Sequence, residues 1–110
     1  MEKYYLMNGK TRLGIVEKDG NNFSFTRNKE VTNAFLYPYY FYQLKPENLD
    51  REVPSIDIET FFRERGYQKD RQGIEVFLHE IGISCYDYWE IAKATNATDI
   101  SDHFRIERID

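Results

Sequence analysis

The chain has 110 residues and a net charge of −4 at pH 7, with 41% hydrophobic and 31% charged residues. This length fits one domain, and the hydrophobic fraction is large enough for a core, which argues against a disordered chain. No apolar run approaches the roughly 18 residues of a membrane span, and the acidic balance argues against nucleic acid as the main ligand. Aromatic residues are unusually frequent, at 16%, with nine Tyr and eight Phe.

The N-terminal residues have none of the features of a secretion signal, because Met1–Tyr4 leads directly into a strand-like pattern without an apolar h-region. The single cysteine, Cys85, has no second cysteine with which to form an internal disulfide. We therefore expect a cytoplasmic protein.

Residues 3–27 predict three antiparallel strands in a meander. The first strand ends at Asn8-Gly9, a pair that accommodates the positive φ angles of a type I′ hairpin turn. The return strand alternates, which places Leu13 and Ile15 on one face. A second turn at Asp19–Asn22 leads into the third strand.

The segment 35–42 contains six aromatic residues in eight positions. Pro38 has no amide donor, so the segment is predicted to be an edge strand or an extended loop across the sheet. Tyrosine clusters bury a large area at low entropic cost, so we interpret the segment as a protein-contact surface. Its candidate contact residues are Tyr37, Tyr39, Tyr40 and Tyr42.

After a polar connector from Lys45 to Pro54, the hydrophobic period changes to that of helices. The first predicted helix is capped by Ser55 or Asp57 and ends near Gly66. Its apolar face consists of Ile58, Phe61 and Phe62.

The second predicted helix carries its apolar residues at helical spacing and stops at Gly82. These residues are Ile74, Phe77, Leu78 and Ile81. The third begins at Ser84, with Asp87 in a capping box, and ends at Asn96. The tail, Asp102–Ile106, alternates like a strand that rejoins the sheet.

These elements predict an α+β fold in which a small antiparallel sheet packs with about three helices. A single domain spans residues 1–110, with strands and the aromatic segment in 1–45 and helices in 55–110. Residues 1–45 contain seven basic and four acidic residues, a net charge of +3, whereas residues 46–110 carry −7. The sheet half and the helical half thus differ in charge.

Catalytic and metal-binding residues are not predicted. Cys85 provides a thiol, but a small apolar packing role between helices is the better interpretation. The remaining residues with suitable chemistry lack a recognised spacing for nucleophilic catalysis or metal binding, and no phosphate-binding loop is present. They are His79, Asp99, Asp102 and His103. We expect a protein without enzyme activity, metal or cofactor.

Basic residues gather between the first two predicted helices, at Arg63, Arg65, Lys69 and Arg71. Acidic neighbours favour a solvated, partly self-paired corner over a phosphate or nucleic-acid site. We retain Arg63 and Arg65 as candidate partner-binding residues.

The order of these patterns resembles the N-terminal domain of HipA-type serine/threonine kinases. The similarity lies in the opening Tyr4–Lys10, in Phe61-Phe62 with Arg65, in Arg71 leading to Gly82-Ile83, and in the closing pattern Asp102–Ile106. It departs from the family at Gly66–Lys69, where the family often has a proline.

The resemblance implies a domain that sits beside a kinase core and contributes no catalytic residue to it. It also implies a role like that of HipS, a separate small protein that binds and restrains the truncated kinase HipT beside the DNA-binding HipB. The leading hypothesis is thus a regulator of a HipA-like kinase toxin, with a protein partner. The alternatives are an acidic nucleic-acid mimic of the anti-CRISPR or anti-restriction type and a module that weakly binds single-stranded nucleic acid.

Overall fold

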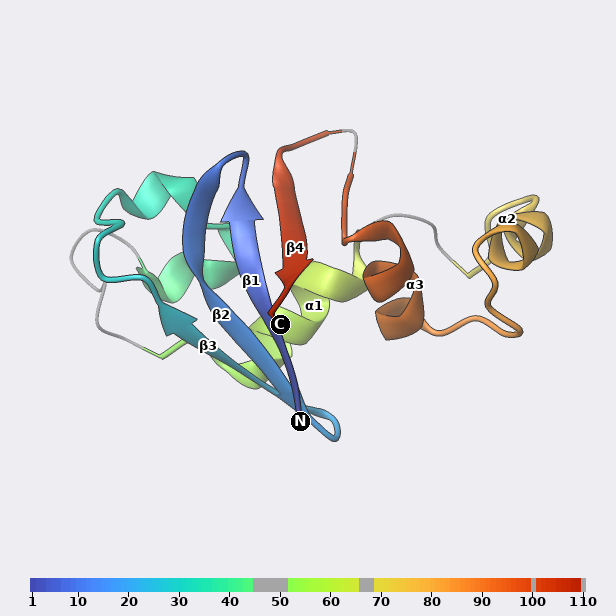
Figure 1. The fold of residues 1–110 in the computed structure, drawn as a ribbon, viewed down its shortest axis with the longest axis horizontal. Helices are drawn as coiled ribbons and strands as arrows, with labels where there is room; N and C mark the ends of the chain where they lie inside the picture. Colours follow the sequence, from blue (N-terminus) through green and yellow to red (C-terminus); the bar gives the residue numbers. More distant parts are fainter. Residues whose placement is uncertain (45–51, 66–68, 100, 110) are drawn as a thin grey trace.

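The computed structural model describes residues 1–44, 52–65, 69–99 and 101–109, and the side chains of 42–44 are outside this description. Four antiparallel strands form one sheet in the order β3-β2-β1-β4, packed with helices (Figure 1). The predicted α+β fold is confirmed. The elements are β1 (Glu2–Asn8), β2 (Thr11–Asp19), β3 (Asn22–Arg27), the 3-10 helices η1 (Ala34–Leu36) and η2 (Tyr39–Leu44), α1 (Ser55–Arg63), α2 (Ile74–Glu80), α3 (Tyr88–Thr95) and β4 (Phe104–Arg108).

The first hairpin turn lies one residue later than predicted. Asn8 pairs with Thr11, so the two-residue loop is Gly9-Lys10 rather than Asn8-Gly9. Gly9 has a φ of 58° and Lys10 does not have a positive φ. This pattern belongs to a type II′ turn, in which only the first loop residue needs the positive φ that glycine adopts freely, and not to the predicted type I′ turn.

A β-bulge in β2 changes which residues enter the core. Leu6 pairs with Gly14 and Met7 pairs with Arg12, so Leu13 is the extra residue of the bulge. Leu13 is buried, and Val16 rather than Ile15 joins it in the core. The expectation that Leu13 and Ile15 share one face was wrong, because the bulge interrupts the period-two alternation on which it was based.

Gly14 is required by the packing of β3 on β2. A Cβ atom at this position would collide with the Thr26 carbonyl oxygen and lie 2.7 Å from Cζ of Phe25. The missing side chain lets the Phe25 ring lie over β2, where it forms an edge-on contact with Phe41 at 5.1 Å between ring centroids. Gly14 therefore helps to position the aromatic segment on the sheet.

The core lies between the sheet and the helices, with α1 crossing the sheet and α3 beside α1 (Figure 1). Phe62 of α1 stacks on Phe23 at 5.7 Å and contacts the Trp89 ring edge-on at 5.2 Å. The sheet contributes Leu6 and Ile106, which pair across β1 and β4. The predicted C-terminal strand is confirmed by this pairing.

The helix ends partly differ from the predictions. Neither Ser55 nor Asp57 caps α1, whose N-cap is Pro54 without a side-chain hydrogen bond. Ser55 Oγ instead accepts a hydrogen bond from the Phe23 amide at 2.8 Å, which ties α1 to β3. The third helix starts later than Ser84, because Asp87 is itself the N-cap of α3.

The aromatic segment is neither an edge strand nor an extended loop, so that prediction was wrong. It forms η1 and η2, with a kink at Phe41 in η2. The side chain of Asn33 caps η1 by accepting a hydrogen bond from the Phe35 amide at 3.0 Å, a local bond that competes with extended structure. The predicted polar connector lies mostly at 45–51, outside the described residues.

The helix α2 lies at the end of the molecule, beyond α3 (Figure 1). Leu78 is the one buried residue of α2. Gly82, the predicted stop after this helix, has a left-handed conformation with a φ of 79°. Cys85 is exposed, so its predicted role as a buried filler was wrong. In the part of the chain that the structure describes, no helix is long and apolar enough to cross a membrane.

Candidate functional site

The side chains of the aromatic segment divide into buried anchors and exposed rings. Tyr37 and Phe41 are buried, with exposed fractions of 5% and 1%, and the Tyr37 hydroxyl donates to the Val31 carbonyl at 3.1 Å. In contrast, Phe35 and Tyr39 are each 87% exposed. The anchors hold the segment on the core and leave the two exposed rings projecting from it.

Tyr40 links the segment to α1. Its hydroxyl donates a hydrogen bond to the carboxylate of Glu64, the C-cap residue of α1. The Tyr39 and Tyr40 rings meet edge-on, with centroids 5.9 Å apart. We define the aromatic surface as Phe35, Tyr39 and Tyr40.

Two of the four candidate tyrosines thus lie on this surface. Tyr37 is part of the core and offers no free contact area. The side chain of Tyr42 lies outside the described residues. Phe35, which the sequence reasoning did not select, is as exposed as Tyr39, and the cap at Asn33 was the sequence signal for the turn that exposes it.

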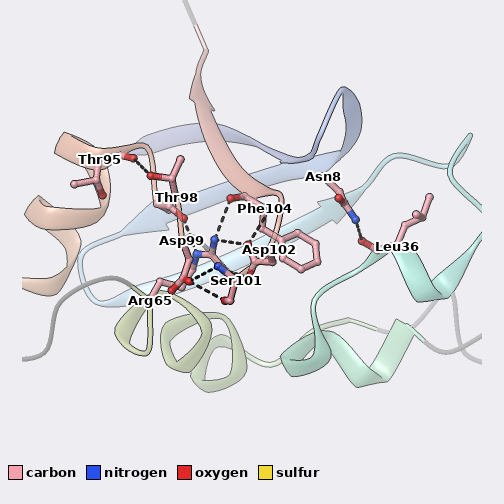
Figure 2. A network of polar contacts seen from close by, with 10 residues as sticks. Asn8, Leu36, Arg65, Thr95, Thr98, Asp99, Ser101, Asp102 and Phe104 are labelled. Carbon is pink, nitrogen blue, oxygen red and sulfur yellow. Dashed lines mark hydrogen bonds and ion pairs between the residues drawn. The ribbon is translucent and has the colours of Figure 1, made fainter.

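A second tether holds the opposite end of η1. The Asn8 side-chain amide, at the end of β1, donates to the Leu36 carbonyl at 2.9 Å (Figure 2). From the sequence, Asn8 was predicted only as a residue of the hairpin turn. Its side chain instead fixes η1 beside the sheet, so Phe35 is presented from a held turn.

The two candidate arginines have different environments. Arg63 is exposed, forms an ion pair with Glu59 at 3.1 Å, and places its guanidinium 4.1 Å from the centroid of the Tyr88 ring. The Arg65 side chain is only 8% exposed. The structure therefore does not bring Arg63 and Arg65 together on one basic surface.

Arg65 joins the end of α1 to the start of β4 (Figure 2). Two parallel hydrogen bonds of 2.8 Å run from its guanidinium to the Asp102 carboxylate, and two more reach the carbonyls of Ala97 and Phe104 at 2.6 and 3.0 Å. Such bidentate pairs combine strength with a fixed geometry. Because its donors are used within the chain, Arg65 holds the fold together and is not available to a partner.

We expect a specific pH dependence from this pair. The Arg65 hydrogen bonds hold the pKa of the Asp102 carboxyl below its usual range, so the pair stabilises the fold above the unfolded-state pKa of about 3.9 and less as the pH falls through the folded-state pKa. The free energy of unfolding of wild type should exceed that of Asp102→Asn at neutral pH, and the difference should narrow in acid. Urea unfolding of both proteins from neutral to acidic pH measures this difference in the free energy of unfolding. A difference that does not change with pH would contradict the role of the Asp102 carboxylate.

The two aspartates considered for catalysis or metal binding have other partners. Asp102 is held by Arg65, and the Asp99 carboxylate accepts from the amide and hydroxyl of Ser101 at 2.9 and 2.7 Å. Across the described ranges, no three His, Cys, Asp or Glu residues are grouped so that they could hold a metal ion. His103 and Cys85 are both exposed.

The comparisons with known proteins give no relative. No family model, curated protein or solved structure matches this chain. The function of this chain must therefore be inferred from its own residues, and above all from the aromatic surface.

Proposed function

We propose that the chain is a non-catalytic protein-binding domain that contacts its partner through the aromatic surface. The observation that carries the proposal is the contrast within one short segment, where Tyr37 and Phe41 are buried while Phe35 and Tyr39 are almost fully exposed. Two large aromatic side chains remain in water although their neighbours reach the core.

The energetics of burial favour this use. Burying one such side chain releases about 1.5–3 kcal/mol, and tyrosine is among the residues enriched in interface hot spots. The rings project from a segment that is held by Tyr37, Phe41 and the Tyr40–Glu64 hydrogen bond. A held surface loses little conformational entropy on binding, which leaves more of the burial energy for affinity.

As the partner we propose a HipA-type kinase, which the domain would bind and regulate in the cytoplasm as part of a toxin–antitoxin system. The support is the resemblance described above, together with the order of the elements. An N-terminal meander, three helices and a closing strand follow one another as that resemblance implies. The exposed rings provide the contact that such a regulator needs.

An acidic nucleic-acid mimic has less support, because several acidic side chains are neutralised within the chain. Glu59 pairs with Arg63 and Asp102 pairs with Arg65, whereas a mimic needs a continuous acidic face. A single-strand-binding module also has less support, since most aromatic rings of the sheet half lie in or against the core.

Substituting Tyr39 by Ala is expected to raise the dissociation constant of the complex with the kinase about tenfold or more, because a hot-spot side chain contributes roughly 1.4 kcal/mol or more. Phe35→Ala should act in the same direction. Isothermal titration of the purified kinase with each variant measures the effect.

The matched control is Val76→Ala, which truncates an exposed apolar side chain on α2, away from the aromatic surface. The dissociation constant of the complex between Val76→Ala and the kinase should equal that of the wild-type complex. A kinase complex that is unaffected by Tyr39→Ala and Phe35→Ala would overturn the assignment of the contact to the aromatic surface, and no complex with wild type would overturn the choice of partner.

A further inference from the structure

A carboxylate lies at the hydroxyl of Tyr40, one of the two tyrosines of the aromatic surface. Glu64 accepts the hydrogen bond of Tyr40, whose ring contacts that of Tyr39 edge-on. All three residues retain access to solvent, and Glu64 and Tyr39 are exposed. This corner therefore combines a negative charge with a pair of aromatic rings.

The cations in the described part of the chain do not neutralise Glu64. Among the described residues, Glu64 takes part in no ion pair. Its two neighbours in sequence are arginines with other partners, since Arg63 pairs with Glu59 and Arg65 pairs with Asp102. Within the ranges that the structure describes, the charge of Glu64 is thus not used in an ion pair, and it can attract a cationic group of a partner.

We propose that the corner formed by Tyr39, Tyr40 and Glu64 binds an arginine side chain of the partner protein. This inference deepens the proposed function and rests on it. A guanidinium attracts the carboxylate through charge and lies on an aromatic ring through cation–π contact. Its planar donors suit both interactions better than the compact ammonium of lysine.

The same pairing already occurs within this chain. The guanidinium of Arg12 lies 3.7 Å from the centroid of the Tyr5 ring. That of Arg63 lies 4.1 Å from the Tyr88 ring while it also pairs with the carboxylate of Glu59. Tyr88, Arg63 and Glu59 thus show an aromatic ring, a guanidinium and a carboxylate assembled as we propose for the partner's arginine on Tyr39, Tyr40 and Glu64.

The corner is held before a partner arrives. Phe41, the residue after Tyr40, is buried against Phe25 and Phe61. Hydrogen bonding to the Glu64 carboxylate raises the pKa of the Tyr40 hydroxyl, so this hydroxyl stays protonated at neutral pH and keeps donating. The remaining lone pairs of the carboxylate are available to an incoming guanidinium.

The direct test uses the wild-type chain and two short peptides, acetyl-Gly-Arg-Gly-amide and the matched peptide with citrulline, which has nearly the same shape without the charge. NMR titration should shift the ring resonances of Tyr39 and Tyr40 with the arginine peptide, with millimolar affinity, and should leave them nearly unchanged with the citrulline peptide. Equal shifts with both peptides, or none with either, would overturn the proposal.

The variant Glu64→Gln separates charge from shape, because its amide oxygen still accepts the Tyr40 hydrogen bond. It should remove the response to the arginine peptide, whereas Glu80→Gln, at an exposed position on α2, should keep it. With the kinase, Glu64→Gln should raise the dissociation constant severalfold. If Tyr39→Ala weakens the kinase complex but Glu64→Gln leaves it unchanged, the arginine site is wrong while the protein-binding function stands.

Discussion

Replacing Arg65 by Met is expected to lower the free energy of unfolding by about 3 kcal/mol. Removing one partner of a buried ion pair costs about 3–5 kcal/mol, and the lower end applies because Asp102 remains partly exposed. The variant also leaves the carbonyls of Ala97 and Phe104 without the donor that satisfies them. The loss should appear as a lower midpoint in urea unfolding.

The neighbouring Arg63 provides the matched control. Arg63→Met removes an exposed ion pair with Glu59 and the contact with Tyr88, together about 1 kcal/mol at most. Arg65→Lys keeps the charge but not the planar fork, so its stability should fall between those of wild type and Arg65→Met. Equal losses for Arg63→Met and Arg65→Met would contradict the assignment of Arg65 to the framework of the fold.

Replacing Phe62 by Ala is expected to cost about 4 kcal/mol, within the range of 3–5 kcal/mol for truncating a buried Phe. Phe62 is 1% exposed and contacts Phe23, Phe61 and Trp89 with its ring. The cavity would lie where α1, α3 and the sheet meet, so relaxation of the surrounding side chains can fill it only in part.

The control for Phe62 is Phe35→Ala, which removes the same side chain from an exposed position. Its effect on stability should stay within about 0.5 kcal/mol, as for surface substitutions. Thermal unfolding of the two variants makes the comparison. A large loss of stability for Phe35→Ala would mean that Phe35 supports the fold, and it would remove Phe35 from the proposed contact surface.

The predictions from the sequence succeeded where a local pattern decides the structure. Alternation predicted the meander, and helical spacing predicted the apolar face of α1. The left-handed ends at Asn96 and Gly82 followed from the residues that tolerate that conformation. Each of these signals lies within a few residues of the feature it predicts.

Features that depend on distant contacts were not predictable in this way. Arg65 was interpreted as part of a basic corner, because its partner Asp102 lies 37 residues away in the sequence and no local pattern links the two. The bulge at Leu13 depends on the register between two strands, and α1 uses Ser55 to contact Phe23 instead of capping its own helix.

The candidate contact residues show the same limit. Composition located the aromatic segment but could not separate Tyr37, which packs in the core, from Tyr39, which projects into solvent. The 3-10 turns determine that difference, and they depend on the tethers of Asn8, Asn33 and Tyr40. Glu64 was not among the candidate residues. Its hydrogen bond with Tyr40 joins two residues that are 24 positions apart in the sequence, and only the folded chain brings them together.

The proposed binding of a HipA-type kinase through the aromatic surface can be tested with the purified kinase, by comparing its affinity for wild type, Tyr39→Ala and Val76→Ala. We expect wild type and Val76→Ala to bind with equal affinity and Tyr39→Ala to bind about tenfold more weakly or worse, with all three equally stable. A folded wild-type chain that does not bind the kinase, or a complex that is indifferent to Tyr39, would contradict this proposal.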